Sequence, residues 1–220
     1  MPATMPQRQT EVAPAALDWF RSDAGQGLLV AEGSAVERVL QRCPALPWAW
    51  LGVEAADPPP AIGRGILLRR RDRDWAGSVR CRLPLPLPSE SFGAVLLQHV
   101  LDDEAGPDAL LGECARVLAP GGTLWLAALN PWTPYRARWA GTGLHATVPG
   151  RWQMALRRAG FSGNSISVQW LGPLWHVGAG TAGIGLTDRF RAGMALTVGK
   201  RVRSVIPPAR LRLRSAIMGG

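Results

Sequence analysis

Residues 85–132 read LPLPSESFGAVLLQHVLDDEAGPDALLGECARVLAPGGTLWLAALNPW and carry the strongest pattern in the chain. The apolar run at residues 93–101 predicts a buried strand. Residues 107–118 predict a helix, because apolar side chains recur at intervals of three and four and Pro107 suits a first-turn position. After the APGG turn, residues 123–129 predict a second buried strand. This order predicts two parallel strands joined by a crossover helix.

Apolar runs and helical periodicity predict further elements on both sides of this stretch. The expected helices cover residues 15–42, with Ser34 as a possible N-cap after an interruption near 23–27, and residues 149–161. The expected strands cover residues 48–53, 65–70, 78–83, 165–171 and 192–202. Because strands alternate with helices, we expect an α/β fold with a doubly wound, Rossmann-like and mostly parallel sheet.

The chain has 220 residues, of which 47% are hydrophobic, so one domain with a substantial core is expected over residues 14–203. Residues 1–13 are polar without periodicity and predict a disordered tail, and residues 204–220 predict a basic tail. No apolar run approaches the ~20 residues of a membrane-spanning helix, and the N-terminus does not resemble a signal peptide. A cytoplasmic protein is the expectation.

Charge is divided unequally along the chain. Residues 1–113 hold 11 basic and 15 acidic residues, whereas residues 114–220 hold 14 basic residues and one acid, Asp188, a net charge of +13. This asymmetry predicts a polyanion, an anionic membrane surface or a negatively charged substrate near the second half. The alternative is an ordinary solvated face.

The cysteines and histidines do not suggest a metal centre. Cys43, Cys81 and Cys114 form no CxxC pair, and His99 has no partner at the spacing of zinc ligands. The glycine-rich residues 178–186 lack the frame of a phosphate-binding loop, so we interpret them as a connection. No metal is expected.

The segment order in residues 85–132 resembles the class I methyltransferases that use S-adenosylmethionine, in particular their type-11 branch. The shared features are an LPLP segment before SF, an apolar strand, an acidic linker, a helix ending in RVLAPGG and a further strand. The resemblance implies a sheet whose last two strands form an antiparallel hairpin, S-adenosylmethionine as cofactor, and a methyl acceptor that the sequence does not identify.

The resemblance also implies a cofactor site at the carboxyl ends of the strands, with a glycine turn after the first strand and acids after the second and third. In this chain Gly52 matches the first glycine, but Glu54 stands at the second. Arg69, Arg70 and Arg71 stand where the ribose-binding acid is expected. The cofactor motifs are therefore degenerate, and weak or lost cofactor binding is expected.

Candidate site residues follow from this comparison. The expected cofactor-binding residues are Gly52, Glu54, Asp57, Gln98, His99 and Val100. His99 could act as a general base or could be a hydrogen-bonded pocket histidine. Asn130 could orient the acceptor, with Trp132 stacking on it, or could belong to an ordinary turn.

Two functions remain open at this point. The first is a divergent, working methyltransferase in which Glu54 or Asp57 replaces the ribose-binding acid. The second is a cofactor-free protein that keeps the fold as a binding or scaffold platform, since fold alone does not establish function.

Overall fold

The computed structural model describes residues 16–43, 45–60, 63–72, 74–103, 106–162, 166–174 and 187–201. The predicted tails at 1–13 and 204–220 and the glycine-rich residues 178–186 lie outside these residues. Within them, no helix is both long enough and apolar enough to cross a membrane.

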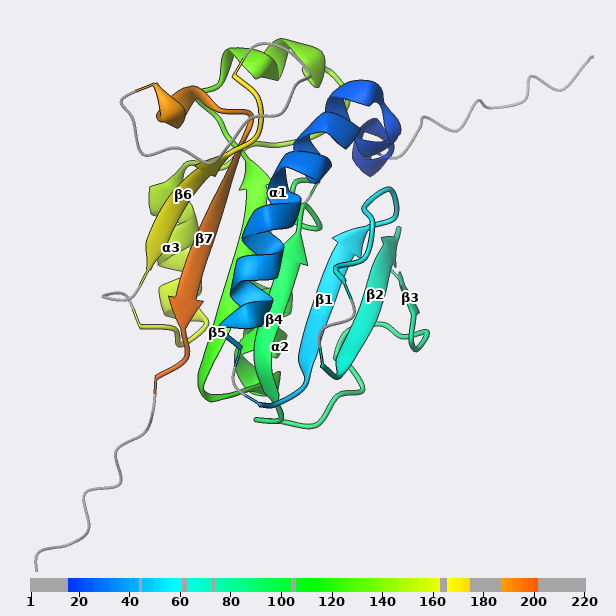
Figure 1. The fold of residues 1–220 in the computed structure, drawn as a ribbon, viewed down its shortest axis with the longest axis vertical. Coiled ribbons are helices and arrows are strands. Elements are labelled where there is room, and N and C mark those ends of the chain that lie inside the picture. The colour runs from blue at the N-terminus through cyan, green and yellow to red at the C-terminus, as the bar shows by residue number, and fades with distance from the viewer. Residues whose placement is uncertain are drawn as a thin grey trace, which may run out of the picture.

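A seven-stranded sheet forms the centre of the molecule, with strand order β3-β2-β1-β4-β5-β7-β6 (Figure 1). The strands are β1 (Trp48–Val53), β2 (Gly65–Arg71), β3 (Asp74–Gly77), β4 (Phe92–Gln98), β5 (Leu118–Leu129), β6 (Ser167–Leu171) and β7 (Gly193–Gly199). The pairs β2–β1, β1–β4 and β4–β5 are parallel, and β7 runs antiparallel to both β5 and β6. The expected mostly parallel sheet with a C-terminal antiparallel hairpin is confirmed.

Helices cover both faces of this sheet (Figure 1). The α-helices are α1 (Asp23–Gln41), α2 (Asp108–Val117) and α3 (Pro149–Arg158), and the described short 3₁₀ helices are η1 (Ala16–Arg21), η2 (Pro134–Arg138) and η4 (Asp188–Phe190). α1 lies over one face, and α2 and α3 lie on the opposite face. Each face has its own hydrophobic cluster, so both sides of the central strands are buried.

The first helical region is divided at a different residue from the one expected. η1 ends at Arg21, and Ser22 is the N-cap of α1, accepting a hydrogen bond from the Gly25 N–H at 3.2 Å. Ser34 lies inside α1, where it caps nothing. The expectation of a Ser34 cap was wrong, because Ser22 satisfies the free N–H groups three turns earlier.

The predicted strand at 78–83 is absent, and β3 lies earlier at Asp74–Gly77 as an antiparallel partner of β2. A parallel neighbour needs a crossover of a dozen or more residues, but only two residues separate β2 from β3. Asp72 makes the tight turn with a φ of 53°. Within the expected strand, Cys81 forms only an isolated bridge with Trp75.

The connection between β1 and β2 contains no helix among its described residues, 54–60 and 63–64. In nucleotide-binding α/β folds, the helix after the first strand presents its N-terminus to the ligand. The described part of this connection therefore presents no helix N-terminus to a ligand at the carboxyl end of β1.

Candidate functional site

A chain of buried hydrogen bonds joins α1 to the carboxyl end of β4. Trp50 Nε1 donates to Gln98 Oε1 at 3.0 Å, and Gln98 Nε2 donates to Glu32 Oε2 at 2.9 Å. Glu32 Oε1 lies 2.8 Å from His99 Nε2, and His99 Nδ1 lies 2.6 Å from Asp102 Oδ2. We call Glu32, His99 and Asp102 the buried triad; all three residues are fully buried.

The rest of the surroundings hold the buried triad in place. The backbone N–H of Leu129, at the end of β5, donates to both Asp102 carboxylate oxygens at 3.2 Å. The Phe20 ring packs on the His99 ring with 4.5 Å between centroids. His99 itself adopts a left-handed backbone conformation with a φ of 58°. Three segments distant in sequence therefore meet at this histidine.

The buried triad retains a proton at neutral pH. Burial alone would lower the pKa of His99, but the charge of Glu32 and the hydrogen bonds to Asp102 and Glu32 outweigh it and raise the pKa to about 10. Both ring nitrogens face carboxylate oxygens, and only an imidazolium donates from both. Burial also raises the pKa of the Asp102 carboxyl, an effect that the hydrogen bond to His99 and the charge of His99 partly offset. His99 is therefore a buried cation held between two acidic side chains.

This geometry does not support the general-base role considered for His99. The ring has no exposed surface, both nitrogens are occupied, and a pKa of about 10 leaves it protonated at neutral pH. A general base must reach the proton it removes and be unprotonated at the working pH. The alternative, a hydrogen-bonded structural histidine, fits these observations.

An open pocket of about 410 Å³ lies beside the buried triad, at the carboxyl ends of β1 and β2. We call it the charged pocket. Seven ionisable residues line it: Asp18, Arg21, Glu54, Arg70, Arg71, Asp72 and Asp103. Four carboxylates against three guanidinium groups give the lining a formal charge of −1.

Ion pairs already connect the walls of the charged pocket. Glu54, directly after β1, pairs with Arg21 of η1 at 3.1 Å and with Arg71 of β2 at 2.9 Å. These arginine side chains are about 60% exposed, 59% and 62%, so the pairs are weak and exchangeable. A ligand can replace either guanidinium at Glu54 at small energetic cost.

Arg70 is held more firmly. Its side chain is only 8% exposed, and its Nη1 donates to the Val100 carbonyl at 2.6 Å while its Nε donates to the Asp72 carbonyl at 2.9 Å. Asp103 pairs with it at 3.6 Å. Arg70 thus fixes the loop after β4 against the end of β2.

Comparison with known proteins adds to this geometry. A family model described as a methyltransferase domain matches residues 70–126. A crystal structure of an S-adenosylmethionine-dependent methyltransferase from Thermotoga maritima superposes with a TM-score of 0.55 at 17% identity, covering 81% of this chain and 92% of that one. Another, from Archaeoglobus fulgidus, gives 0.52 at 11% identity, covering 83% and 97%. The chain has the fold of the class I S-adenosylmethionine-dependent methyltransferases.

A chain in the complex between the Trm112 methyltransferase activator of Haloferax volcanii and a methyltransferase is also similar, with a TM-score of 0.52 at 15% identity, covering 85% of this chain and 98% of that one. Comparison with curated proteins finds no significant match. The resemblance of residues 85–132 to the methyltransferases is confirmed. It establishes a methyltransferase-like fold and does not identify the methyl acceptor.

The glycine that matched the methyltransferase cofactor turn has a different neighbour in this structure. A Cβ atom on Gly52 would lie 2.0 Å from Cζ2 of Trp50, so the indole of Trp50 covers Gly52. Gln26 donates from Nε2 to the Phe20 and Ala55 carbonyls at 2.9 and 3.0 Å, which ties α1 to the segment after β1. Gly52 is thus required for packing of the chain itself and offers no cradle to a cofactor.

The structure separates the other expected cofactor residues into two groups. Glu54 lines the charged pocket, whereas Asp57 is exposed and lies outside its lining. Gln98 and His99 are buried in the hydrogen-bond chain, and the Val100 carbonyl is taken by Arg70. Of the six, only Glu54 is placed to touch a ligand in that pocket.

Asn130 uses its side chain within the scaffold. Its Nδ2 donates to the carbonyls of Arg189 and Arg191, both at 2.7 Å, and its Oδ1 accepts from the Trp132 N–H at 3.0 Å. The residue is fully buried, which leaves no group to orient an acceptor. Trp132 does remain accessible, at 49% exposure, beside Trp170 with 5.7 Å between ring centroids.

The sequence interpretation missed the buried contacts of Glu32 and the role of Arg70 in holding the loop after β4. Glu32 falls on the apolar stripe of α1 with Leu28 and Val36, four residues to either side, and a carboxylate in such a stripe signals a buried partner. Arg70 carried no comparable signal. No group of three or more metal-binding side chains occurs among the described residues.

Proposed function

We propose that this protein is a divergent S-adenosylmethionine-dependent methyltransferase that holds its cofactor in the charged pocket and works in the cytoplasm. The observation that carries the proposal is the position of the pocket. β1 pairs with β2 on one side and β4 on the other, so the chain reverses direction across the sheet at β1. Ligands of open α/β sheets bind outside the carboxyl ends of the strands at such a reversal.

The chemistry of the lining supports this assignment. The cofactor carries a sulfonium, an ammonium and a carboxylate, one net positive charge, and the lining carries one net negative charge. Glu54 and Asp72 would accept hydrogen bonds from the ribose hydroxyls, and Asp103 would face the positively charged groups of the cofactor. Arg21 would pair with the cofactor carboxylate, exchanging its contact with Glu54.

The bound cofactor would supply a methyl group on a sulfonium that is already an activated leaving group. The task of this chain is then to bind, orient and exclude water, which suffices when proximity provides most of the acceleration. This suits a site in which His99 and Asn130 are both occupied by the scaffold.

Binding should be weak. The glycine turn is covered by Trp50, and Arg70 stands where an acid would receive the ribose. Each missing charge-assisted hydrogen bond costs about 1.5–3 kcal/mol. A loss of about 1.4 kcal/mol weakens binding tenfold, so relative to a micromolar site we expect dissociation constants from the high-micromolar to the millimolar range.

A thermal-shift titration of the wild-type protein tests whether binding occurs. We expect saturable stabilisation by S-adenosylmethionine, and less by S-adenosylhomocysteine, which lacks the sulfonium charge. Equal, unsaturable effects of both compounds would argue against binding in a negatively charged pocket.

A second candidate function is a cofactor-free binding protein. It is favoured by the indole of Trp50 over Gly52, because this contact closes the place where methyltransferases approach the cofactor with backbone. The absence of any stabilisation at several millimolar S-adenosylmethionine would put this candidate first.

A further inference from the structure

Two short helices meet beyond the carboxyl end of β5: η2, from the chain that follows β5, and η4, from the chain that precedes β7 (Figure 1). Thr133 Oγ1, at the N-cap of η2, donates to the Phe190 carbonyl at 2.7 Å. Asn130 Nδ2 holds the same segment through the carbonyls of Arg189 and Arg191. Two segments distant in sequence therefore form one continuous surface at this end of the sheet.

Three exposed arginines lie on this surface, each with its guanidinium over an aromatic ring of its own segment. The pairs, with the distance from Cζ to the ring centroid, are Arg136–Trp139 (5.7 Å), Arg138–Tyr135 (5.2 Å) and Arg189–Phe190 (4.8 Å). Such cation–π contacts are attractive and limit the freedom of a long side chain. A ligand that binds these guanidinium groups therefore pays a smaller entropy cost.

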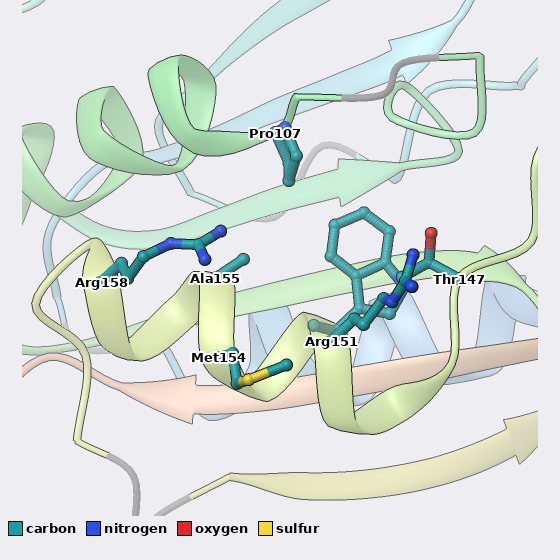
Figure 2. Close-up of a pocket in the computed structure, with 7 residues that line it drawn as sticks. Pro107, Thr147, Arg151, Met154, Ala155 and Arg158 are labelled. Atoms are coloured by element: carbon teal, nitrogen blue, oxygen red, sulfur yellow. The ribbon is translucent and has the colours of Figure 1, made fainter.

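No carboxylate neutralises these three arginines among the described residues. The chain contains no acid between Glu113 and Asp188, and Asp188 pairs with the neighbouring Arg191 at 2.6 Å. Arg136, Arg138 and Arg189 form no ion pair with any residue that the structure describes. By contrast, Arg158, which lies on α3 near Pro107 (Figure 2), pairs with Asp108 at 3.0 Å. The surface at η2 and η4 thus presents uncompensated positive charge.

An accessible aromatic ring lies next to these charges. Trp132 is 49% exposed, and its ring packs on that of Trp170 in β6 with 5.7 Å between centroids. Its backbone is fixed, because its N–H donates to Asn130 Oδ1 at 3.0 Å. Within residues 130–138 and 187–191 it is the one large apolar side chain that is exposed. We call Trp132 and the three arginines the basic aromatic surface.

This combination favours one kind of polyanion. Single-stranded nucleic acids present phosphates to guanidinium groups and unpaired bases that stack on aromatic rings. In a duplex the bases stack on one another and are not available to Trp132. An anionic membrane fits less well, because binding there needs a broad apolar face, and this surface exposes a single large apolar side chain.

We propose that the basic aromatic surface binds single-stranded nucleic acid, with a base stacked on Trp132 and phosphates paired with the three guanidinium groups. η1 joins this surface to the charged pocket: Trp19 Nε1 donates to the Arg138 carbonyl at 2.8 Å, and Arg21 of the same helix lines the pocket. The strand lies beside the pocket. The inference is independent of the proposed function, because no residue of the basic aromatic surface lines the charged pocket.

Fluorescence anisotropy of labelled oligonucleotides with the full chain tests the proposal. Strands of about 12 nucleotides fall within the usual site sizes of single-strand binding folds. The probes are single-stranded RNA, single-stranded DNA, a DNA duplex and a DNA strand of the same length without bases. The titrations contain no S-adenosylmethionine, so their outcome is separate from that of the cofactor titration.

We expect the single strands to bind at low salt about tenfold more tightly than the strand without bases, equivalent to about 1.4 kcal/mol. Making Arg136→Gln, Arg138→Gln and Arg189→Gln together should weaken binding by about tenfold or more. Each phosphate contact of a single strand contributes about −0.7 to the log-log salt slope, so this variant should bring the slope about 2 closer to zero.

The matched control removes three exposed arginines at the opposite, amino ends of the parallel strands. Arg38→Gln and Arg42→Gln lie at the end of α1, and Arg64→Gln lies directly before β2. This variant has the same net charge as the first, and its affinity should stay within about twofold of the wild type, a change of about 0.4 kcal/mol.

The stacking contact has its own pair of variants. Trp132→Ala should weaken binding of the single strands by about tenfold, since stacking of one base is worth about 1–3 kcal/mol. It should leave the affinity for the strand without bases unchanged. Trp132→Phe keeps a ring at this position and should retain most of the binding.

Tighter binding of RNA or of DNA would identify which of the two is the ligand. Equal affinity for the strand without bases or for the duplex would overturn the proposal, as would equal losses in the two triple variants or an unchanged affinity in Trp132→Ala. Tighter binding to phosphatidylserine vesicles than to any strand would overturn it in favour of a membrane surface.

Discussion

Glu32 of α1 and His99 at the end of β4 form a contact of 2.8 Å between Oε1 and Nε2, with no exposed surface on either residue. The contact ties the N-terminal helix to the point where the sheet reverses direction. Because Asp102 holds the other ring nitrogen, the imidazolium is enclosed by two carboxylates. The buried triad is thus a structural link beside the charged pocket.

Removing one member of this link should destabilise the protein strongly. Glu32→Ala leaves a buried imidazolium with one carboxylate, and breaking a buried pair in this way typically lowers the free energy of unfolding by about 3–5 kcal/mol. Glu37→Ala, at an exposed position of the same helix, should change it by less than about 0.5 kcal/mol. Urea unfolding measures both, and equal small effects would contradict the structural role.

The stability of the protein should fall as the solution becomes alkaline. The folded pKa of His99 is about 10, above the ordinary value of 6.5, so the folded state binds the proton more tightly than the unfolded state. The resulting stabilisation is complete below the unfolded pKa and is lost as the pH rises through about 10. Urea unfolding at a series of pH values checks this trend.

The ring itself offers an independent check on the same prediction. At pH 8 the ¹⁵N signals of the His99 ring should show both nitrogens protonated, because that pH lies below the folded pKa of about 10. A neutral ring at this pH would show that the buried triad does not hold its proton as described.

Gly52 should be sensitive for a reason of packing. An alanine Cβ would collide with the indole of Trp50, so Gly52→Ala should lower the free energy of unfolding by about 1–3 kcal/mol. Gly112→Ala, exposed within α2 with open space around its Cα, should instead stabilise by about 0.5–1 kcal/mol. Thermal unfolding measures both, and a neutral Gly52→Ala would show that Trp50 does not require a glycine there.

Much of the fold could be predicted from the sequence because residues 85–132 combine strong periodicity with clear turn signals. β4 and α2 lie close to their expected ranges. β5 begins at Leu118, five residues earlier than expected, and includes the APGG segment that was predicted as a turn. The prediction of a strand at 78–83 was wrong, because a short apolar pattern does not indicate which strand it would pair with. The tight turn at Asp72 makes β3 the antiparallel hairpin partner of β2.

The site was less predictable, because the same residue types serve packing and binding. A glycine after a buried strand suggested a cofactor turn, yet Trp50, two residues earlier on the same side of the strand, explains it. His99 and Asn130 stood at the expected edge of the sheet, but their partners lie in α1 and in residues 189–191. Contacts this distant in sequence are not visible without the fold.

The most direct test of the charged pocket is a calorimetric titration of S-adenosylmethionine into three proteins: wild type, Glu54→Gln and Asp57→Asn. Glu54 lines the pocket and Asp57, three residues later, does not. The two substitutions therefore remove the same charge, one inside the proposed cofactor site and one outside it. We predict that Glu54→Gln weakens binding by about tenfold, or about 1.4 kcal/mol, while Asp57→Asn leaves it unchanged. No binding to wild type at several millimolar cofactor, or equal affinity in all three proteins, would contradict the assignment of the charged pocket as the cofactor site.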